Sequence, residues 1–171
     1  MGSKPYIILL DGPKGSGKTS VARLLKEKLP QVDFLSLDEE RRKIPNARAT
    51  TEFNRQAFDI ILSKIESAFD SGRGIVLDSG LSRVRVEAIE AIAQKCAASI
   101  FKYALIAPRD VLLSRVRARD EKKSKATDEE RFMYTYTQQQ SKDFHDFTVF
   151  DTSNTLSVDI AAKILNESSK L

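Results

Sequence analysis

One eight-residue motif constrains this chain of 171 residues more than any other feature. Residues 12–19 read GPKGSGKT, a full match to the phosphate-binding P-loop pattern G-x-x-x-x-G-K-[ST]. Glycines let the backbone curl so that its N–H groups point inward and form a nest for phosphate oxygens. In this pattern the ammonium of Lys18 contacts the β- and γ-phosphates, and the hydroxyl of Thr19 binds Mg²⁺. ATP and Mg²⁺ are therefore the expected cofactors. The residues expected to hold the nucleotide are Gly12, Pro13, Lys14, Gly15, Ser16, Gly17, Lys18, Thr19 and Ser20.

The segments on either side of the motif supply the setting that a P-loop requires. Residues 6–10 form a continuous apolar run, as expected for a buried parallel strand. Residues 18–29 carry apolar side chains at helical spacing and leave the intervening positions polar. An ordinary flexible glycine turn is the alternative interpretation, and the order of strand, glycine loop and helix argues against it.

Apolar strand-like runs alternate with amphipathic helical stretches along the whole sequence. This alternation predicts an α/β fold in which helices cover both faces of a parallel sheet, as one domain over residues 1–171. The predicted strands are 6–10, 32–37, 74–78, 99–106 and 147–150. The predicted helices are 18–29, 51–71, 84–97, 108–119, 127–145 and 156–167. The charged residues 120–126 lie between two helices and are either a lid over the nucleotide or a solvated turn.

Composition narrows the class of protein further. The chain is 41% hydrophobic and 30% charged, which is ordinary for a globular protein. Its single cysteine, Cys96, excludes an internal disulfide, and neither a membrane-length apolar run nor a signal peptide is visible. A cytoplasmic location without membrane association is therefore expected. The net charge of +4 suits a phosphate-rich ligand and permits nucleic acid without requiring it.

Two aspartates follow predicted strands, where ligands of parallel sheets bind. Asp38 comes after the second strand and Asp78 ends the third. A phosphoryl-transfer enzyme needs a base for the acceptor hydroxyl and a carboxylate that binds Mg²⁺ through water or orients the acceptor. Each aspartate could instead cap the backbone that follows its strand.

Arginines supply the cations that such chemistry also needs. Arg115 and Arg119 are spaced i, i+4, so they share one face of a predicted helix. There they could clamp the polyphosphate and neutralise charge that develops during transfer. A solvated helix face is the alternative interpretation of the same spacing.

Together these residues give the chain a family resemblance that extends from residue 6 to about residue 165. It resembles the P-loop kinases of the adenylate-kinase-like group, and within it the polynucleotide 5′-kinases and the zeta-toxin and chloramphenicol-phosphotransferase type. The resemblance implies a five-stranded parallel sheet with the P-loop strand in the centre. It also implies Asp38 as general base, Arg41 as a contact to acceptor phosphate, and Arg115 with Arg119 as a lid pair. The loop at 151–154 would border adenine.

The leading hypothesis is an ATP-dependent kinase that phosphorylates an acceptor hydroxyl. In it Lys18, Asp38, Arg115 and Arg119 are catalytic, Thr19 and Asp78 hold the metal, and the acceptor meets Asp38, Arg41, Asp78 and Arg83. A nucleic-acid or nucleotide 5′-hydroxyl is slightly preferred as the acceptor over a small metabolite or drug. The alternative from another class is an ATP-binding module that regulates a partner. The sequence does not determine the oligomeric state.

Overall fold

The computed structural model describes residues 4–169, which form five strands and seven helices; one or two helices follow each strand. The strands are β1 (Tyr6–Asp11), β2 (Val32–Ser36), β3 (Gly74–Asp78), β4 (Ser99–Ile106) and β5 (Thr148–Asp151). The helices are α1 (Lys18–Lys28), α2 (Leu37–Lys43), α3 (Thr51–Asp70), α4 (Arg83–Lys95), α5 (Arg109–Lys122), α6 (Glu129–Gln140) and α7 (Ser157–Ser168). Within the described residues, no helix is both long enough and apolar enough to cross a membrane.

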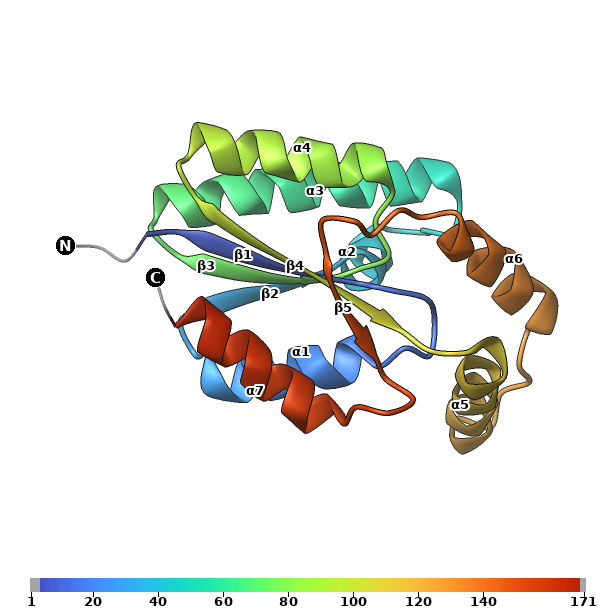
Figure 1. Ribbon diagram of the computed structural model, residues 1–171. Coiled ribbons are helices and arrows are strands. Elements are labelled where there is room, and N and C mark those ends of the chain that lie inside the picture. The colour runs from blue at the N-terminus through green and yellow to red at the C-terminus, as the bar shows by residue number, and fades with distance from the viewer. Residues whose placement is uncertain (1–3, 170–171) are drawn as a thin grey trace.

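The five strands form one parallel sheet in the order β2-β3-β1-β4-β5, with the P-loop strand β1 in the centre as predicted. Successive side chains of a strand point to opposite faces, so an apolar run serves both faces of the sheet. Ile7 and Leu9 of β1 join the core under α3 and α4, whereas Ile8 and Leu10 join the core under α1 and α7. The result is the three-layer α/β fold that the sequence predicted (Figure 1).

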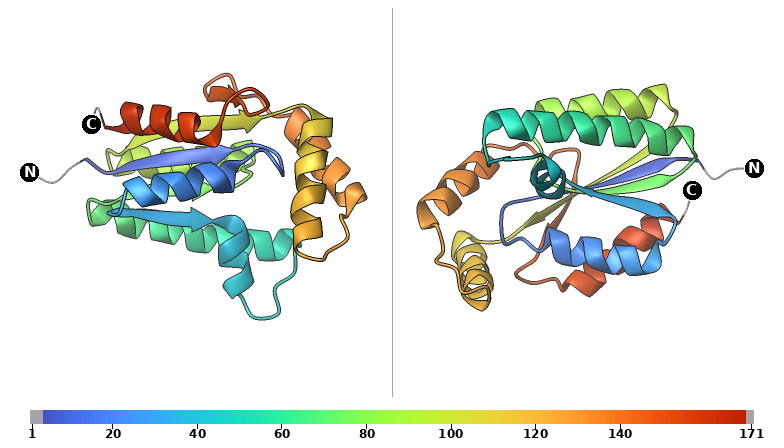
Figure 2. Two further views of the ribbon diagram at one scale, coloured as in Figure 1. Left: turned by 90° about the horizontal axis from the view of Figure 1, so that it is seen from below. Right: turned by 180° about the vertical axis from the view of Figure 1, so that it is seen from behind.

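Two helices lie outside these layers, at the carboxyl ends of the strands. Figure 2 shows α5 and α6 packed side by side beyond that end of the sheet, while both chain termini lie at the opposite end. Leu112 and Val116 of α5 pack with Phe132 of α6 in a small core of their own. The connection between β4 and α5 thus positions the two helices over the P-loop.

One helix of the structure was not predicted, and several predicted boundaries differ from the observed ones. Helix α2 was not predicted, and its first residue, Leu37, was assigned to the preceding strand. Helix α5 continues to Lys122, so the first three residues of the segment 120–126 are helical. Helix α6 begins at Glu129 because Asp128 caps it by accepting the N–H of Arg131, and it ends at Gln140 rather than at 145.

Candidate active site

The P-loop connects the end of β1 to the start of α1 through three glycines with positive φ. Gly12, Gly15 and Gly17 have φ of 141°, 87° and 94°, values that L side chains rarely adopt. Two of them also lack space for a side chain. A Cβ on Gly12 would lie 2.1 Å from the carbonyl oxygen of Leu105, and one on Gly15 would lie 2.7 Å from that of Leu112. Glycine is therefore required at these two positions by crowding as well as by backbone conformation.

The start of α1 provides the donors that phosphate binding needs. The first intrahelical bond runs from Val21 N to Gly17 O, so the N–H groups of Lys18, Thr19 and Ser20 have no intrahelical acceptor. The positive end of the helix dipole lies at the same place. The hydroxyl of Ser16 is buried and has no hydrogen-bond partner among residues 4–169. This end of the loop therefore has several polar groups available to a phosphate ligand.

Lys18 lies folded against the loop that precedes it. Its Nζ donates to Gly12 O at 2.8 Å and to Pro13 O at 3.2 Å. Burial lowers the pKa of this ammonium, and the nearby carboxylates of Asp78, Asp11 and Asp38 act in the opposite direction. The charges of three carboxylates from three chain segments therefore act on this one lysine.

Thr19 of α1 and Asp78 of β3 form a direct hydrogen bond at the carboxyl end of the sheet. Thr19 Oγ1 donates to Asp78 Oδ2 at 2.7 Å, and Asp78 ends β3 beside Leu10 of β1. Burial raises the pKa of Asp78, while Lys18 and the Thr19 hydroxyl oppose that rise. A hydroxyl and a carboxylate are hard oxygen ligands, and Mg²⁺ is usually bound by one or two carboxylates together with substrate phosphates. The pair therefore fits a Mg²⁺ ion bound with a nucleotide, and both residues line a cavity of about 240 Å³ between α1, β2 and β3.

Asp38 lies in the first turn of α2, two residues after the end of β2. Its carboxylate is exposed and forms an ion pair with Arg41, in which Nη2 of Arg41 lies 2.7 Å from Oδ1 of Asp38. Arg41 also donates through Nη1 to Asn54 Oδ1 at 2.7 Å, which ties α2 to the start of α3. Ser36, the last residue of β2, pairs with Asp78, the last residue of β3, so Asp38 and Asp78 lie at the ends of neighbouring strands.

The predicted arginines occupy different environments. Arg115 donates to Thr152 O at 2.6 Å and to Thr152 Oγ1 at 2.9 Å, and its Nη1 lies 3.5 Å from Gly15 O. It therefore connects the P-loop to the loop after β5. Arg119 pairs with the buried Asp120 at 3.1 Å. Burial is the main cause that lowers the pKa of Lys18 and the pKa of Lys14, and the positive charge of Arg119 lowers both pKa values further.

Arg83 lies at the start of α4 and is 79% exposed. Its Nε donates to Glu87 Oε1 at 2.8 Å on the same helix. The structure therefore places this predicted acceptor residue in a solvated ion pair, and its contact with an acceptor stays a prediction.

Sequence reasoning missed two further cations beside the site. Lys142 follows α6, and its Nζ lies 2.9 and 3.0 Å from the two carboxylate oxygens of Asp11, which is 1% exposed. Arg85 of α4 donates to Asn54 O at 3.2 Å. Burial lowers the pKa of Lys142, and the charges of Lys18 and Arg85 lower it further, which puts all three cations in one neighbourhood. Lys142 is 131 positions from Asp11, so no local pattern pointed to it.

Comparison with known proteins identifies the fold and the family. In solved structures the fold recurs in a shikimate kinase from Acinetobacter baumannii, at 21% identity and a TM-score of 0.67, over 98% of this chain and 95% of that one. It recurs in a gluconokinase from Sinorhizobium meliloti, at 17% identity and a TM-score of 0.67, over 98% and 97%. A chain of the Pnkp1/Rnl/Hen1 RNA repair complex matches at 16% identity and a TM-score of 0.68, over 82% of this chain and 45% of that one.

No curated protein sequence matches the chain. One family model does, and it spans residues 7–141, from the second residue of β1 to the residue after α6. The matched segment contains the P-loop, Asp38, Asp78 and both arginines of the predicted lid pair. The chain therefore belongs to the AAA-domain family AAA_33 and has the fold of the P-loop kinases.

Proposed function

We propose that this protein is an ATP-dependent phosphotransferase that moves the γ-phosphoryl group of ATP to a hydroxyl group of an acceptor. The observation that carries the proposal is the 2.7 Å hydrogen bond from Thr19 Oγ1 to Asp78 Oδ2, next to the ammonium of Lys18. Together they form a phosphate cradle with a place for Mg²⁺. Asp38 follows the neighbouring strand and leaves its carboxylate exposed, as an incoming acceptor requires.

The roles of the residues follow from charge and position. Asp38 takes the proton of the acceptor hydroxyl while that oxygen bonds to the γ-phosphorus, and the bond from phosphorus to the β–γ bridging oxygen breaks as ADP leaves. Lys18 and Arg119 neutralise the charge on the transferring group. Thr19 and Asp78 would hold Mg²⁺, which would neutralise negative charge on the nucleotide phosphates. Arg115 holds the loop at Thr152 against the P-loop.

The acceptor that we favour is a nucleic-acid or nucleotide 5′-hydroxyl. The support is the pairing of Asp38 with Arg41, which would place a phosphate-binding guanidinium beside the base, and the likeness to a chain of an RNA repair complex. A small-molecule hydroxyl is the second candidate, because the shikimate kinase and the gluconokinase cover this chain almost completely.

Transfer of label from γ-labelled ATP to a panel of acceptors tests the proposal. The panel holds 5′-hydroxyl DNA and RNA oligonucleotides, nucleosides, nucleotides, sugars and polyols. Label on an oligonucleotide or nucleotide end is the expected result, and label on a small molecule alone would move the protein to the metabolite-kinase class. ATP binding with no transfer to any acceptor would contradict the proposal and favour a regulatory ATP-binding module.

A further inference from the structure

We infer that Arg85 binds an anionic group, a phosphate or a carboxylate, that the acceptor carries beside its reacting hydroxyl. The inference rests on the proposed function, because the acceptor site is defined there by Asp38. It extends that function by naming the class of acceptor and a residue that selects it.

A continuous chain of contacts links Arg85 to the candidate base. Asp38 pairs with Arg41 at 2.7 Å, Arg41 donates to the side chain of Asn54 at 2.7 Å, and Arg85 donates to the backbone oxygen of Asn54 at 3.2 Å. The two guanidinium groups therefore contact one and the same residue. An acceptor whose hydroxyl lies at Asp38 would present its neighbouring group to the region where both arginines end.

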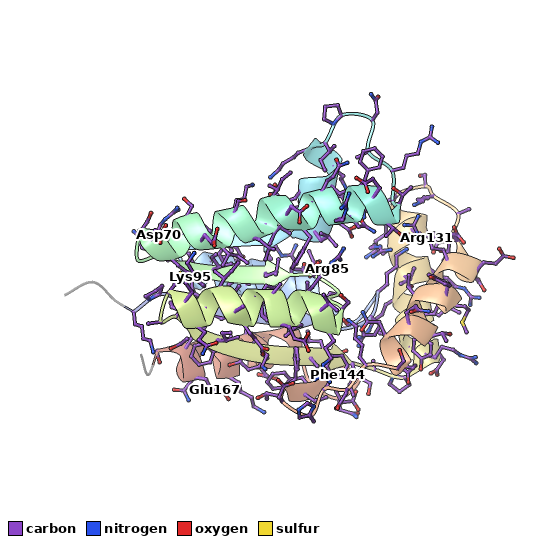
Figure 3. The ribbon with its side chains drawn as sticks, turned by 90° about the horizontal axis from the view of Figure 1, so that it is seen from above. Asp70, Arg85, Lys95, Arg131, Phe144 and Glu167 are labelled. Carbon is purple, nitrogen blue, oxygen red and sulfur yellow. The ribbon has the colours of Figure 1, made fainter. Side chains whose placement is uncertain are left out.

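Figure 3 places Arg85 on α4 next to α3, at the end of the two helices that faces α5 and α6. Lys95 and Asp70 mark the opposite end. The charge of Arg85 also lowers the pKa of Lys142, as does that of Lys18 of the P-loop, and burial is the larger cause of that shift. Arg85 therefore lies at the end of the sheet where the nucleotide and the acceptor are expected.

Arg85 is a half-buried cation without an anionic partner. No carboxylate lies within ion-pair distance of it among residues 4–169, although the charge of Asp59 acts on it from farther away. One of its donors reaches Asn54 O, and its guanidinium lies 5.0 Å from the ring centre of Phe58, within cation–π distance. The fork of an arginine matches the two oxygens of a carboxylate or a phosphate, and its remaining donors are available for such a group.

A purely structural role is the competing explanation, because Arg85 also ties α4 to α3. The two explanations differ in what removal of the charge does to acceptor choice. Loss of a structural tie lowers turnover of every acceptor alike. Loss of an anion-binding group lowers turnover of anionic acceptors and leaves their neutral counterparts unaffected.

The test compares matched acceptor pairs in Arg85→Gln, Arg85→Lys and the wild type, with Arg73→Gln as the control. Arg73 carries the same charge but pairs with Asp33 at the other end of the sheet. The pairs are thymidine 3′-monophosphate with thymidine, and glucuronate with glucose. We expect the wild type and Arg73→Gln to prefer the anionic member of one of the two pairs. The pair that shows this preference tells whether the acceptor's anionic group is a phosphate or a carboxylate.

In Arg85→Gln the kcat/KM for the preferred anionic acceptor should fall about 10- to 100-fold, mainly through KM, the range for a lost hydrogen bond to a charged group. The value for the neutral member should stay unchanged, and Arg85→Lys should retain part of the preference. An equal loss for both members, a retained preference in Arg85→Gln, or a wild type that prefers the neutral member would overturn the inference.

A binding measurement decides the inference even if no acceptor is phosphorylated, an outcome that would count against the proposed function alone. Inorganic phosphate and, in a separate series, acetate are added to each variant with the P-loop filled by Mg²⁺ and a non-hydrolysable ATP analogue, and the melting temperature is compared with that in chloride of equal ionic strength. A rise with either anion in the wild type and Arg73→Gln that is absent in Arg85→Gln supports the anion site. An equal rise in all three variants, or no rise in the wild type with either anion, overturns it.

Discussion

The ion pair between Lys142 and Asp11 offers a direct test of how the segment after α6 is held against the base of the P-loop. Asp11 is 1% exposed and Lys142 is 18% exposed, so the pair is largely removed from water. Lys142→Met keeps most of the apolar stem and deletes the charge. It leaves the carboxylate of Asp11 with the N–H of Gly12, at 2.6 Å, as its remaining donor.

The magnitude follows from the cost of an unpaired buried charge. Removing one member of a buried ion pair costs about 3–5 kcal/mol, and the retained Gly12 bond favours the lower end, about 3 kcal/mol. For a domain of this size each kcal/mol lowers the melting temperature by about 2–4 °C, so a loss of about 6–12 °C is expected. Asp11→Asn can still accept the Gly12 N–H, so the double variant with Lys142→Met should be more stable than the sum of the two single losses predicts.

Urea denaturation of the two single variants, the double variant and the wild type measures the coupling, with scanning calorimetry for the melting temperature. The control is Lys95→Met, which removes a lysine that is 75% exposed, and its stability should differ from the wild type by less than about 0.5 kcal/mol. A Lys142→Met variant as stable as this control, or strictly additive losses in the double variant, would refute the argument.

Two further predictions concern the P-loop and α2. Gly15→Ala should cost about 2 kcal/mol or more and weaken ATP binding, because its Cβ meets Leu112 O at 2.7 Å. Gly17→Ala, whose Cβ has only Ser157 Oγ at 3.7 Å, carries backbone strain alone, so equal urea stabilities of the two variants would contradict the crowding argument. Burial raises the pKa of Glu40, but Lys43 and Lys64 outweigh it and hold the pKa below its ordinary value. The stabilisation is therefore fully present above about pH 4.5 and is lost as pH falls through the lowered pKa, so the difference between wild type and Glu40→Gln should shrink on acidification. A difference that stays constant from pH 7 to below pH 4 would refute this assignment.

The strands were predictable because a parallel sheet covered on both faces needs uninterrupted apolar runs, and residues 6–10 and 75–77 show them. The P-loop was predictable because its backbone needs positive φ angles at fixed positions, and glycine adopts them readily. Helix α2 was not, because its seven residues hold one buried apolar side chain, Leu37, and are too few to establish a helical period. The acidic start and basic end of that segment were the signal that could have revealed it.

The acceptor side of the candidate site was less predictable than the nucleotide side. Asp38 and Asp78 were found because each lies at or just after the end of a strand, and the carboxyl ends of parallel strands lie at one edge of the sheet. Arg85 and Lys142 follow no strand directly. Their positions depend on how α4 packs beside α3 and on where α6 ends, which are tertiary features without a local sequence pattern.

Phosphoryl transfer by Asp38→Asn tests the central claim most directly, with ATP affinity measured in the same variant. The substitution keeps the size of the side chain and removes its capacity to take a proton. The account predicts unchanged ATP binding and a transfer rate that falls by about 10²–10⁴-fold, the contribution of a general base. Asp33→Asn, at the opposite end of β2, is the matched control and should keep the wild-type rate. Full transfer activity in Asp38→Asn would contradict the account.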